Sequence, residues 1–423
     1  MNTSLNTNLN TSLNTSLNTS LKNGKICITT LEFPPDVGGV GESVSRIAKL
    51  LTHEGYEVHV AVFRSKQRLV PDGVRRQASC KTTLQEGIHV HRIQSAAREA
   101  VPEIQDFFSE VYFYLRQLHE RHSFDVFHAF FLNETGYVTT LLAKEFNVPV
   151  INSVRGSDLH KHIFNPKTHG QIAWMLDNSS WTTFVSRDLQ RRAIALVPNV
   201  RSKSSAFWNS IVPFEFAPLP KPALLAQRSG IVIGSTGRFR DKKGIEYLLQ
   251  ACAKLSHEIP LTLLLVGDFV DKERAYWEQQ VRSSGIGDRL CVTGIISREE
   301  ALSYLPHLDI YAIPSLHDGC PNAMLEAMLA GCPVVGSKVD AIGEILADGT
   351  SGLVVEPANV EELTQALRQL VTQPTLRQRL GKGARQKVLT ELAPTVEKAN
   401  WLTVYHHILQ SQTDDARPNL AIV

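Results

Sequence analysis

The sequence predicts an α/β protein with two doubly wound domains. Two observations carry this prediction. Short apolar runs alternate with amphipathic helical stretches along the 423 residues, and this rhythm stops at a proline-rich segment and then restarts. At about 150 residues per domain, the length allows roughly two to three domains. Apolar residues make up 43% of the chain and charged residues 20%, which is typical of an ordinary globular protein.

The first domain is expected over residues 24–215. It begins with a β-rich run at residues 26–28 and a loop at residues 32–41. A helix should follow, because apolar residues recur at i, i+3, i+4 and i+7: Val44, Ile47, Ala48 and Leu51. Alternating apolar residues then predict the next strand, at Val58, Val60 and Val62. Further strands are predicted around residues 126–128, 148–151 and 183–185.

The remaining segments follow from composition. Residues 216–230 should be a linker, because three prolines near its start prevent helix formation and interrupt strand pairing. A second domain of the same class is expected over residues 231–394, and residues 395–423 should form a closing helix and tail. Residues 1–23 are predicted to be a disordered low-complexity tail, because the Asn, Thr, Ser and Leu repeat carries too little apolar surface to order a backbone. Within the second domain, a helix is predicted at 245–252. Strands are predicted at 231–233, 261–266, 290–293, 309–313, 333–335 and 353–355.

Charge, apolar content and residue motifs limit the partners, location and metal sites that the sequence predicts. The 44 basic and 42 acidic residues nearly cancel, so no nucleic-acid partner is expected. The chain has no run of 18 or more apolar residues and no signal-peptide pattern at its start, which predicts a cytoplasmic location. The six cysteines form no CxxC pair and are expected to be reduced. The histidines form no HExxH motif, and no metal site is assigned.

Basic residues gather in three segments of the first half, at residues 64–68, 75–76 and 187–203. Two interpretations stay open. Solvated faces are favoured, and a peripheral contact with the inner face of a membrane is the alternative.

The sharpest chemical pattern spans residues 318–328. Asn322 follows Pro321 and is placed to cap a helix whose free amides favour a bound phosphate. Glu326, one turn later, has two acceptor oxygens that suit the paired hydroxyls of a ribose, and Asp318 is placed to hold sugar hydroxyls. A capped helix with incidental acidic residues explains the spacing equally well.

Two glycine-containing turns add weaker signals. Arg238 and Lys243 bring two cations to a turn after a strand, where they would neutralise a diphosphate in place of a metal ion. A solvated basic turn is the blander alternative. In the first domain, Gly38 and Gly39 lack the full dinucleotide-binding spacing, and a tight turn explains them as well.

Arg155 and Asp158 follow another strand of the first domain. Ligands of open α/β sheets bind at the carboxyl ends of strands, so both are candidates for the site. A simple pair between the two side chains is the alternative.

Together these segments resemble the retaining glycosyltransferases of family 4, also described as glycosyl transferases group 1. The similarity runs from Lys25 to about Tyr405. The matching segments, in chain order, are FPPDVGG at 33–39, GYEV at 55–58, DVFHA at 125–129, RGSD at 155–158, VS at 185–186, NSI at 209–211, GRF at 237–239, KG at 243–244, VG at 266–267 and the block 314–337 that ends in AGCPVVGS.

The resemblance implies the GT-B fold, with two facing Rossmann-like domains and a nucleotide-diphosphate sugar, a UDP-sugar or a GDP-sugar, in the cleft between them. It implies catalytic roles for Arg238, Lys243 and Asp318, with no metal and no other cofactor. The donor-binding residues that we carry over from the motifs are Gly38, Gly39, Arg155, Asp158, Gly319, Cys320, Asn322, Ala323 and Glu326.

Five positions depart from the usual family pattern. Asp318 stands where Glu is more common, Cys320 where an aromatic residue is common, and Arg155 where many members carry His. Asp340 and Ala341 replace a common pair of glycines. These departures bear on the identity of the donor.

The expected function is therefore retaining, metal-independent sugar transfer from a nucleotide sugar to a glycan or lipid-linked acceptor, in the biosynthesis of a polysaccharide or glycoconjugate. Two alternatives stay open: a nucleotide-sugar 2-epimerase, which needs no acceptor, and a non-catalytic nucleotide-sugar-binding partner of another transferase.

Overall fold

The computed structural model describes residues 24–36, 38–64, 78–95, 105–216, 222–226 and 230–415. The tail predicted over residues 1–23 lies outside the described residues, as do 217–221 and 227–229 of the linker and the last eight residues of the closing segment. The described chain forms two units, each with its own sheet. One unit holds the chain up to Phe184, Arg192–Ser205 and the residues from Lys398 onward, and the other holds Val185–Arg191 and Ala206–Glu397.

The first unit is built on an eight-stranded sheet with the order β3-β4-β2-β1-β5-β6-β7-β8. From β4 to β7 neighbouring strands pair in parallel, and the strand order reverses between β1 and β5, as in a dinucleotide-binding fold. The strands are β1 (Lys25–Thr30), β2 (Glu57–Arg64), β3 (Ser79–Gln85), β4 (Ile88–Gln94), β5 (Val126–Phe130), β6 (Val150–Val154), β7 (Trp181–Phe184) and β8 (Ser204–Ala206).

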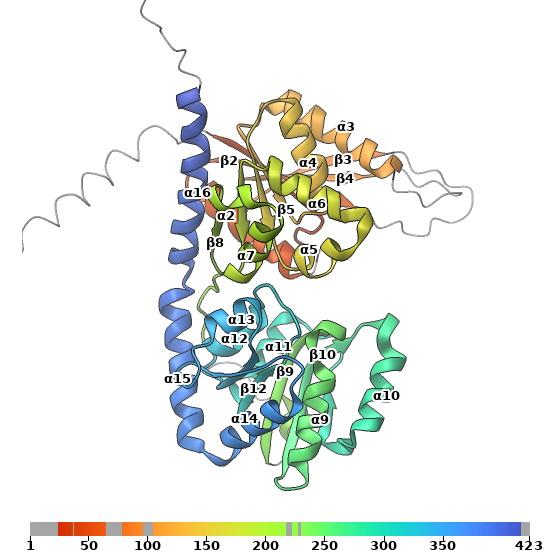
Figure 1. Cartoon of the computed structure of the whole chain (residues 1–423), viewed down its shortest axis with the longest axis vertical. Helices are drawn as coiled ribbons and strands as arrows, with labels where there is room; N and C mark the ends of the chain where they lie inside the picture. Colours follow the sequence, from red (N-terminus) through yellow and green to blue (C-terminus); the bar gives the residue numbers. More distant parts are fainter. Residues whose placement is uncertain are drawn as a thin grey trace, which may run out of the picture. The chain divides into compact units, whose positions relative to one another are not determined.

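Helices connect these strands (Figure 1). The helices of this part of the chain are α2 (Gly39–His53), α3 (Gln105–His122), α4 (Glu134–Glu145), α5 (Ser157–His160), α6 (Pro166–Asn178) and α7 (Arg187–Leu196). Helices α3 and α4 pack on the sheet face that carries Cys27, Ala61 and Phe127. The apolar spacing predicted for the first helix is confirmed, because Val44, Ile47, Ala48 and Leu51 are all buried on α2.

The second unit repeats this topology with six parallel strands in the order β11-β10-β9-β12-β13-β14. The order again reverses next to the first strand, here between β9 and β12. The predicted class of two doubly wound α/β domains is therefore confirmed. The strands are β9 (Ile231–Phe239), β10 (Leu261–Phe269), β11 (Leu290–Val292), β12 (Ile310–Ile313), β13 (Val334–Ser337) and β14 (Leu353–Val355).

Two apolar cores cover the two faces of this second sheet. Alternate residues of β10 divide between them: Leu263 and Leu265 join one core, whereas Leu264 and Val266 join the other. Helices α9, α10 and α14 contribute to the first core, α11, α12 and α13 to the second, and α15 to both. Their bounds are α8 (Ala223–Ala226), α9 (Ile245–Ser256), α10 (Arg274–Ser284), α11 (Arg298–Tyr304), α12 (Asn322–Leu329), α13 (Asp340–Ile345), α14 (Val360–Thr372) and α15 (Pro374–Glu391).

The predicted closing helix is α16 (Pro394–Asp415). From Lys398 onward it belongs to the first unit, where Trp401 and Tyr405 are buried. The Tyr405 hydroxyl lies 2.6 Å from Nδ1 of His128 on β5. The aromatic side chains of α16 therefore pack into the first unit.

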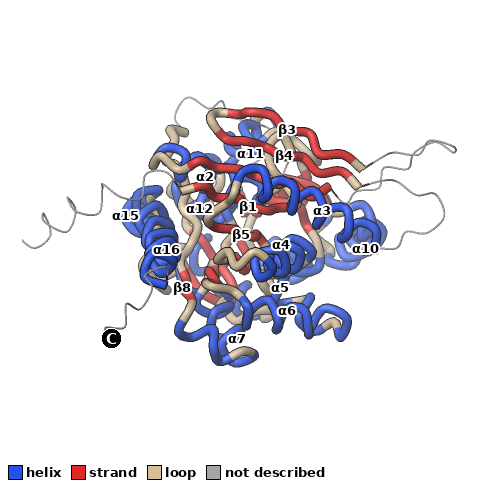
Figure 2. Tube along the Cα trace, turned by 90° about the horizontal axis from the view of Figure 1, so that it is seen from above, coloured by secondary structure: helices blue, strands red, loops and turns tan. Residues whose placement is uncertain are grey.

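Some elements differ from the sequence-based expectation. The antiparallel hairpin of β3 and β4, at the edge of the first sheet (Figure 2), was not predicted, because β3 is largely exposed and has no apolar run. Strand β9 extends through Arg238, so Gly237 lies within the strand. The linker, expected to be free of helix, contains α8 directly after Pro222, whose fixed φ suits a helix start.

All six cysteines are free, and four of them are buried, in agreement with the predicted reduced thiols. Burial holds the pKa of Cys332 at about 12, so this thiol stays protonated. Among the described helices, none is both long and apolar enough to cross a bilayer.

Candidate functional site

In the second unit, the candidate site lies where the strand order reverses. Strand β9 ends in the basic turn, and its neighbour β12 ends at the loop of residues 314–321. Ligands of open α/β sheets bind at such a point, outside the carboxyl ends of the strands. The topology therefore brings together two motifs that lie about 75 residues apart in the sequence.

A glycine allows the two loops to meet. Gly244 lies at the start of α9 with φ +61°, and a Cβ atom at this position would lie 2.1 Å from the carbonyl oxygen of Pro314. Any other residue would be strained and would collide with the backbone. A hydrogen bond of 2.9 Å from the Leu316 amide to the Lys242 carbonyl joins the loops further.

Two lysines of the basic turn converge on one carboxylate. The Nζ atom of Lys243 lies 2.5 Å from one oxygen of Asp318, and Nζ of Lys242 lies 3.4 Å from the other. All three side chains are largely buried, with exposed fractions of 24% or less. Since two ammonium groups share a single carboxylate, the group carries a net positive charge.

The ionisation of Asp318 reflects this arrangement. Burial by itself disfavours the charged form, but the charges of Lys243 and Lys242 outweigh it and hold the pKa of Asp318 at about 2. The backbone is also fixed, because the Asp318 amide donates a 2.9 Å hydrogen bond to the carboxylate of Asp340. Asp318 is therefore an oriented, ionised acceptor at neutral pH.

Asp340 occupies a position that favours glycine. Its φ is +43°, in the left-handed region, and Asp is one of the few residues other than glycine that adopt this conformation. The departure from the usual Gly-Gly pair is thereby explained: the backbone conformation is kept, and the added carboxylate binds the Asp318 amide. The next amide, of Ala341, donates to the Gly319 carbonyl at 3.2 Å.

The prediction that Asn322 caps the following helix is wrong. The helix begins at Asn322 itself, Pro321 occupies the cap position, and no side chain caps the helix. The Asn322 side-chain oxygen instead accepts a 3.0 Å hydrogen bond from Asn209, which also donates to the Cys320 carbonyl at 3.3 Å. The Asn209 side chain thus holds the loop in front of the helix.

The amino end of α12 still offers backbone donors. The amides of Met324 and Leu325 donate to the Pro321 carbonyl, so those of Asn322 and Ala323 precede the first bonds of the helix. Both residues are half-buried. The helix dipole adds partial positive charge at this end, next to the loop that carries Asp318.

Glu326 lies one turn into α12 and pairs with an arginine of α11. Its Oε1 accepts from Nη2 of Arg298 at 2.8 Å and from Nε at 3.2 Å. The arginine is 62% exposed and the glutamate only 15% exposed, so the pair lies at the surface. The structure places Glu326 on the same short helix as Asn322 and Ala323, as predicted.

Arg238 lies on β9 in register with Asp268 of β10. Asp268 also accepts a 2.9 Å hydrogen bond from Arg274, which together with the charge of Arg238 lowers the pKa of the Asp268 carboxyl. The Arg238 side chain is exposed at the carboxyl end of β9. Arg238 therefore lies at the same edge of the sheet as Lys243. Arg238 is part of β9, whereas Lys243 lies in the turn that follows this strand.

In the first unit, the predicted glycines lie at the equivalent reversal of strand order. Gly38 precedes α2 and Gly39 is its first residue, directly after the loop that follows β1. A Cβ atom at Gly38 would lie 1.9 Å from the Glu32 carboxylate, so the small residue makes room for that side chain. No atom lies within 4 Å of a Cβ built at Gly39, so there is open space beside the first residue of α2.

Arg155 and Asp158 have separate partners. The Asp158 carboxylate is buried and accepts hydrogen bonds from the amides of Leu132, Arg155 and Gly156, at 2.7, 2.8 and 3.1 Å. The Arg155 guanidinium donates to the Ser43 hydroxyl at 3.0 Å and lies over the Phe130 ring. Asp158 therefore organises the loops at the carboxyl ends of β5 and β6, whereas Arg155 reaches α2.

Sequence reasoning gave no role to three polar residues of the second-unit site. Asn209 and Asp340 act through the contacts above, and Ser315 is fully buried with a hydroxyl that has no hydrogen-bond partner among the described residues. Ser315 lies two residues after the end of β12. Because ligands bind at the carboxyl ends of the strands, its position in the sequence could have identified it as a candidate site residue. Asn209 begins the matching NSI segment at 209–211, but that match assigns the residue no role.

Comparison with known families agrees with this geometry. The profile described as "Glycosyl transferases group 1" matches residues 221–387, and the profile described as "Glycosyltransferase Family 4" matches residues 37–208. Together the two matches span most of both units.

Several curated relatives are glycosyltransferases by name. The chain is 33% identical over 189 residues to the 2-deoxystreptamine glucosyltransferase of Streptomyces kanamyceticus, which covers 44% of this chain and 46% of the relative. It is 29% identical over 240 residues to the MMP alpha-(1->4)-mannosyltransferase of Mycolicibacterium hassiacum, covering 53% and 57%. These matches thus span about half of each relative. The N-acetyl-alpha-D-glucosaminyl L-malate synthase of Bacillus anthracis matches at 23% identity over 89% of this chain and 96% of its own.

Solved structures share the fold over nearly the whole chain. Sucrose-phosphate synthase from Thermosynechococcus elongatus superposes with a TM-score of 0.74 at 19% identity, covering 92% of this chain and all of the other. HepE of Anabaena in complex with UDP superposes with a TM-score of 0.68 at 16% identity over the same share. The fold is accordingly GT-B, with two Rossmann-like domains. From its sequence profiles and its fold, the chain belongs to the group 1 glycosyltransferases.

Proposed function

We propose that this protein is a retaining, metal-independent glycosyltransferase that moves a hexose-type unit from a nucleotide-diphosphate sugar to a glycan or lipid-linked acceptor. The observation that carries this proposal is the cluster of Lys242, Lys243 and Asp318 in front of α12. A nucleoside diphosphate is a compact anion, and the cluster offers it a net positive charge on buried, oriented side chains.

The chemistry of the leaving group fits these cations. Cleavage of the bond between the sugar and the phosphate leaves negative charge on the diphosphate, and fixed positive groups stabilise that charge in the transition state. Lys243 and Arg238 would supply two such groups, and the amides at the start of α12 a third. In this arrangement the protein performs the charge neutralisation that a divalent metal ion supplies in other transferases.

The acidic residues suit the other parts of the donor. Asp318 is ionised and held by backbone contacts, so it is suited to accept hydrogen bonds from sugar hydroxyls. Glu326 would accept from the ribose hydroxyls, with Arg298 fixing the rotamer of its carboxylate. No enzymic nucleophile is assigned.

The first unit would bind the acceptor and the phosphate-proximal part of the donor. Gly38 and Gly39 at the start of α2 and Arg155 after β6 lie at the carboxyl edge of this sheet. This is the edge at which ligands of open α/β sheets bind.

The donor is tested by thermal unfolding with UDP, GDP, ADP and CMP, with and without EDTA. Selective binding should stabilise the native protein by about 2.7 kcal/mol at one hundred times the dissociation constant. The EDTA arm is compared with EDTA-treated protein that lacks nucleotide, which separates the nucleotide effect from any effect of the chelator. UDP is the first candidate, since Anabaena HepE was solved with UDP and with UDP-glucose.

Lys243→Ala should abolish most of the nucleotide-dependent shift. The matched control is Lys272→Ala, which removes an exposed lysine of the same unit. Equal shifts in both variants, or no shift with any nucleotide in the native protein, would refute the donor site.

Turnover separates the transferase from its alternatives. With a labelled donor, transfer to an added glycan or lipid-linked acceptor with retained anomeric configuration is the expected result. An epimerised nucleotide sugar formed without acceptor would identify a 2-epimerase. Nucleotide-sugar binding without either product across a panel of acceptors would support a non-catalytic binding partner.

A cytoplasmic location with contact at the inner face of a membrane belongs to this proposal. Of the basic segments behind it, residues 65–77 lie outside the described residues. In the described segment, Lys203 donates to the carbonyls of Asp177 and Ser179, and Arg191 pairs with Asp188. Co-sedimentation with anionic liposomes at low salt is the test, and lack of binding there would remove the membrane contact from the proposal.

A further inference from the structure

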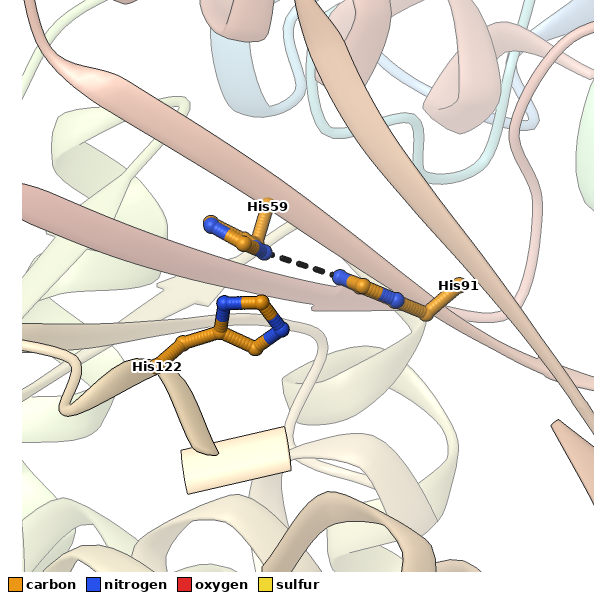
Figure 3. A group of neighbouring side chains, drawn as sticks. All are labelled: His59, His91 and His122. Atoms are coloured by element: carbon orange, nitrogen blue, oxygen red, sulfur yellow. Dashed lines mark hydrogen bonds between the residues drawn. The ribbon is translucent and has the colours of Figure 1, made fainter. Parts of the chain in front are cut away.

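A group of histidines lies in the first unit, at the edge of its sheet opposite the carboxyl ends. His59 is near the start of β2, His91 is on the adjacent β4, and His122 is the last residue of α3 (Figure 3). One ring nitrogen of each residue lies within 4.8 Å of the others. The candidate donor-binding residues belong to other elements, so this group has no part in the function proposed above.

The pattern on the two strands explains why the rings meet. Residues two apart on a strand share a face, so Glu57 and His59 point to one side of β2, as His89 and His91 do on β4. His59 is in register with His89, and Ala61 with His91. The same face carries Ala61 and Phe63 into the core under α3, and the end of that helix delivers His122.

The inner nitrogens of two rings face each other. Nδ1 of His59 lies 2.8 Å from Nε2 of His91, and the rings are nearly parallel, with 7° between their planes. The His122 ring lies against this pair, with its centroid 4.4 Å from that of His59. Both His59 and His91 are fully buried, and His122 is half-buried at the rim.

The outer nitrogens are held by oxygen atoms. Nε2 of His59 lies 2.9 Å from the Glu57 carboxylate, and Nδ1 of His91 lies 2.8 Å from the Thr82 hydroxyl of β3. Metal-binding histidines almost always have such a partner on the ring nitrogen that faces away from the metal.

The hydrogen bonds fix the tautomer of His59 and leave two tautomers open to His91. A carboxylate only accepts, so His59 donates from Nε2 and keeps a lone pair on Nδ1. His91 then donates from Nε2 to His59 and accepts at Nδ1 from Thr82. Because a hydroxyl both donates and accepts, Thr82 also permits the other tautomer, in which Nε2 of His91 carries a lone pair. Both inner nitrogens then carry lone pairs, and these lone pairs face each other across the 2.8 Å contact.

Neutral rings are ready for this role. Burial lowers the pKa of His59 to about 4 and that of His91 to about 3, and it lowers the pKa of His122 as well. Lone pairs on neutral imidazoles are the form in which histidine binds metals. The Glu57 carboxylate would offset part of the added charge, and Lys25, 3.9 Å from it, is the nearby cation.

We propose that His59, His91 and His122 bind one divalent transition-metal ion, Zn²⁺ by preference, separate from the sugar-transfer site. Tetrahedral Zn²⁺ with nitrogens at 2.0 to 2.1 Å places its ligands about 3.3 Å apart. The lone pairs of His59 and His91 lie nearly along the line between the two nitrogens, so both rings would tilt and their nitrogens would separate by about 0.5 Å to bind the ion. The half-buried His122 would turn inward. The fourth position would hold water, and the ion would join β2, β4 and α3.

The neighbouring group of Glu57, His59 and His89 also lies within ligand distance. We favour the three histidines for two reasons. Imidazole ligands suit Zn²⁺ and similar ions, and the outer nitrogen of His91 is already fixed. Glu57 is 40% exposed and serves His59 from outside the group.

The test measures metal binding by the full chain, prepared without a histidine-containing tag and stripped with a chelator. Titration with Zn²⁺, followed by metal analysis of the desalted protein, should give one bound ion per chain and a raised unfolding temperature. Co²⁺ should give the visible absorption of a tetrahedral site. Absence of binding by the folded native chain would overturn the proposal.

Variants locate the ion. His122→Gln should weaken Zn²⁺ binding at least tenfold, whereas His89→Gln and the exposed His53→Gln should retain it. Retained binding in His122→Gln with loss in His89→Gln would assign the ion to the other group and overturn the proposal. Equal weakening in all three variants would indicate surface chelation and overturn it too.

Thr82→Val provides a second measurement that leaves all three ligands in place. Loss of an outer partner of a metal-bound histidine costs about 10- to 100-fold in affinity, so Zn²⁺ should bind correspondingly less tightly. This variant decides the question if His122→Gln fails to fold. An unchanged affinity in Thr82→Val would then contradict the site.

Discussion

Asp318 shows how one side chain organises the candidate donor site. Its carboxylate joins Lys242 and Lys243, and its amide is held by Asp340. The shorter side chain, compared with the Glu more usual in the family, still reaches both ammonium groups. The aspartate therefore both orients the cations and lowers their mutual repulsion before a donor arrives.

The ion cluster should make stability depend on pH. The pKa of Asp318 is lower in the folded protein than its ordinary value, so its contribution is present above about pH 4 and is lost as pH falls through about 2. At neutral pH this contribution is about 2 kcal/mol, of which about 1 kcal/mol should be lost by pH 3. Urea unfolding of the native protein and Asp318→Asn between pH 3 and 7 measures the difference. A gap between the two that does not change with pH would contradict the ion pairs.

Glu326→Gln should separate binding from stability. Its arginine partner is exposed, so the lost pair should cost no more than about 1 kcal/mol in unfolding free energy. Nucleotide affinity should fall about tenfold, equal to about 1.4 kcal/mol, because the amide accepts ribose hydroxyls less well than a carboxylate. Glu258→Gln, which breaks the Arg368 pair of the same unit, is the control, and an equal loss of affinity there would argue against a ribose role.

At the scale of elements, the site is two loops that follow adjacent strands. Gly244 permits the basic turn to touch the carbonyl of Pro314, and this approach brings Lys243 next to Asp318. The geometry of the ion cluster therefore depends on a backbone contact that carries no charge.

Gly244→Ala should disturb that contact. Positive φ and the collision with Pro314 together should cost about 1–3 kcal/mol of stability and shift Lys243 away from Asp318, with weaker nucleotide binding. Gly285→Ala is matched, since Gly285 has φ +76° but no atom within 4 Å of an added Cβ. Unfolding and nucleotide titration of both variants distinguish strain alone from loop displacement. Equal losses of nucleotide binding in both would show that the contact with Pro314 does not matter.

The predictability of elements depended on burial. The apolar runs of β1, β10 and β12 are buried along their length, and their patterns predicted them. Strand β3 is an exposed edge strand held by pairing with β4, and such a strand needs no apolar face. The start of α12 was predicted one residue late because the Asn322 side chain serves Asn209 rather than its own helix.

At the scale of the whole molecule, the chain ends in the unit in which it began. Trp401 and Tyr405 of α16 are buried there, and the ring of Trp401 lies 5.1 Å from that of His128. Lys398 pairs with Glu54 of the same unit. The last helix therefore supplies part of the first core.

Trp401→Ala should destabilise the first unit by about 3–5 kcal/mol, as expected for a fully buried large side chain. Hydrogen exchange followed by mass spectrometry should show faster exchange in peptides of the first unit, including the early strands. Trp277→Ala, at a fully buried position of the second unit, should show the reverse pattern. Equal acceleration in both units by either variant would show that the two units open together.

The sequence by itself determined the class of both domains and most of the strands, whereas the donor-binding roles of Lys243, Asp318 and Glu326 stay predictions. These properties follow from periodicity and from residue types that lie close together in the chain. Only the tertiary structure decided that Asn209 reaches Asn322, that Arg298 reaches Glu326, and that three histidines from separate elements lie within 4.8 Å of one another. Such contacts depend on strand register and on loops that meet across a sheet edge, and no local pattern encodes either.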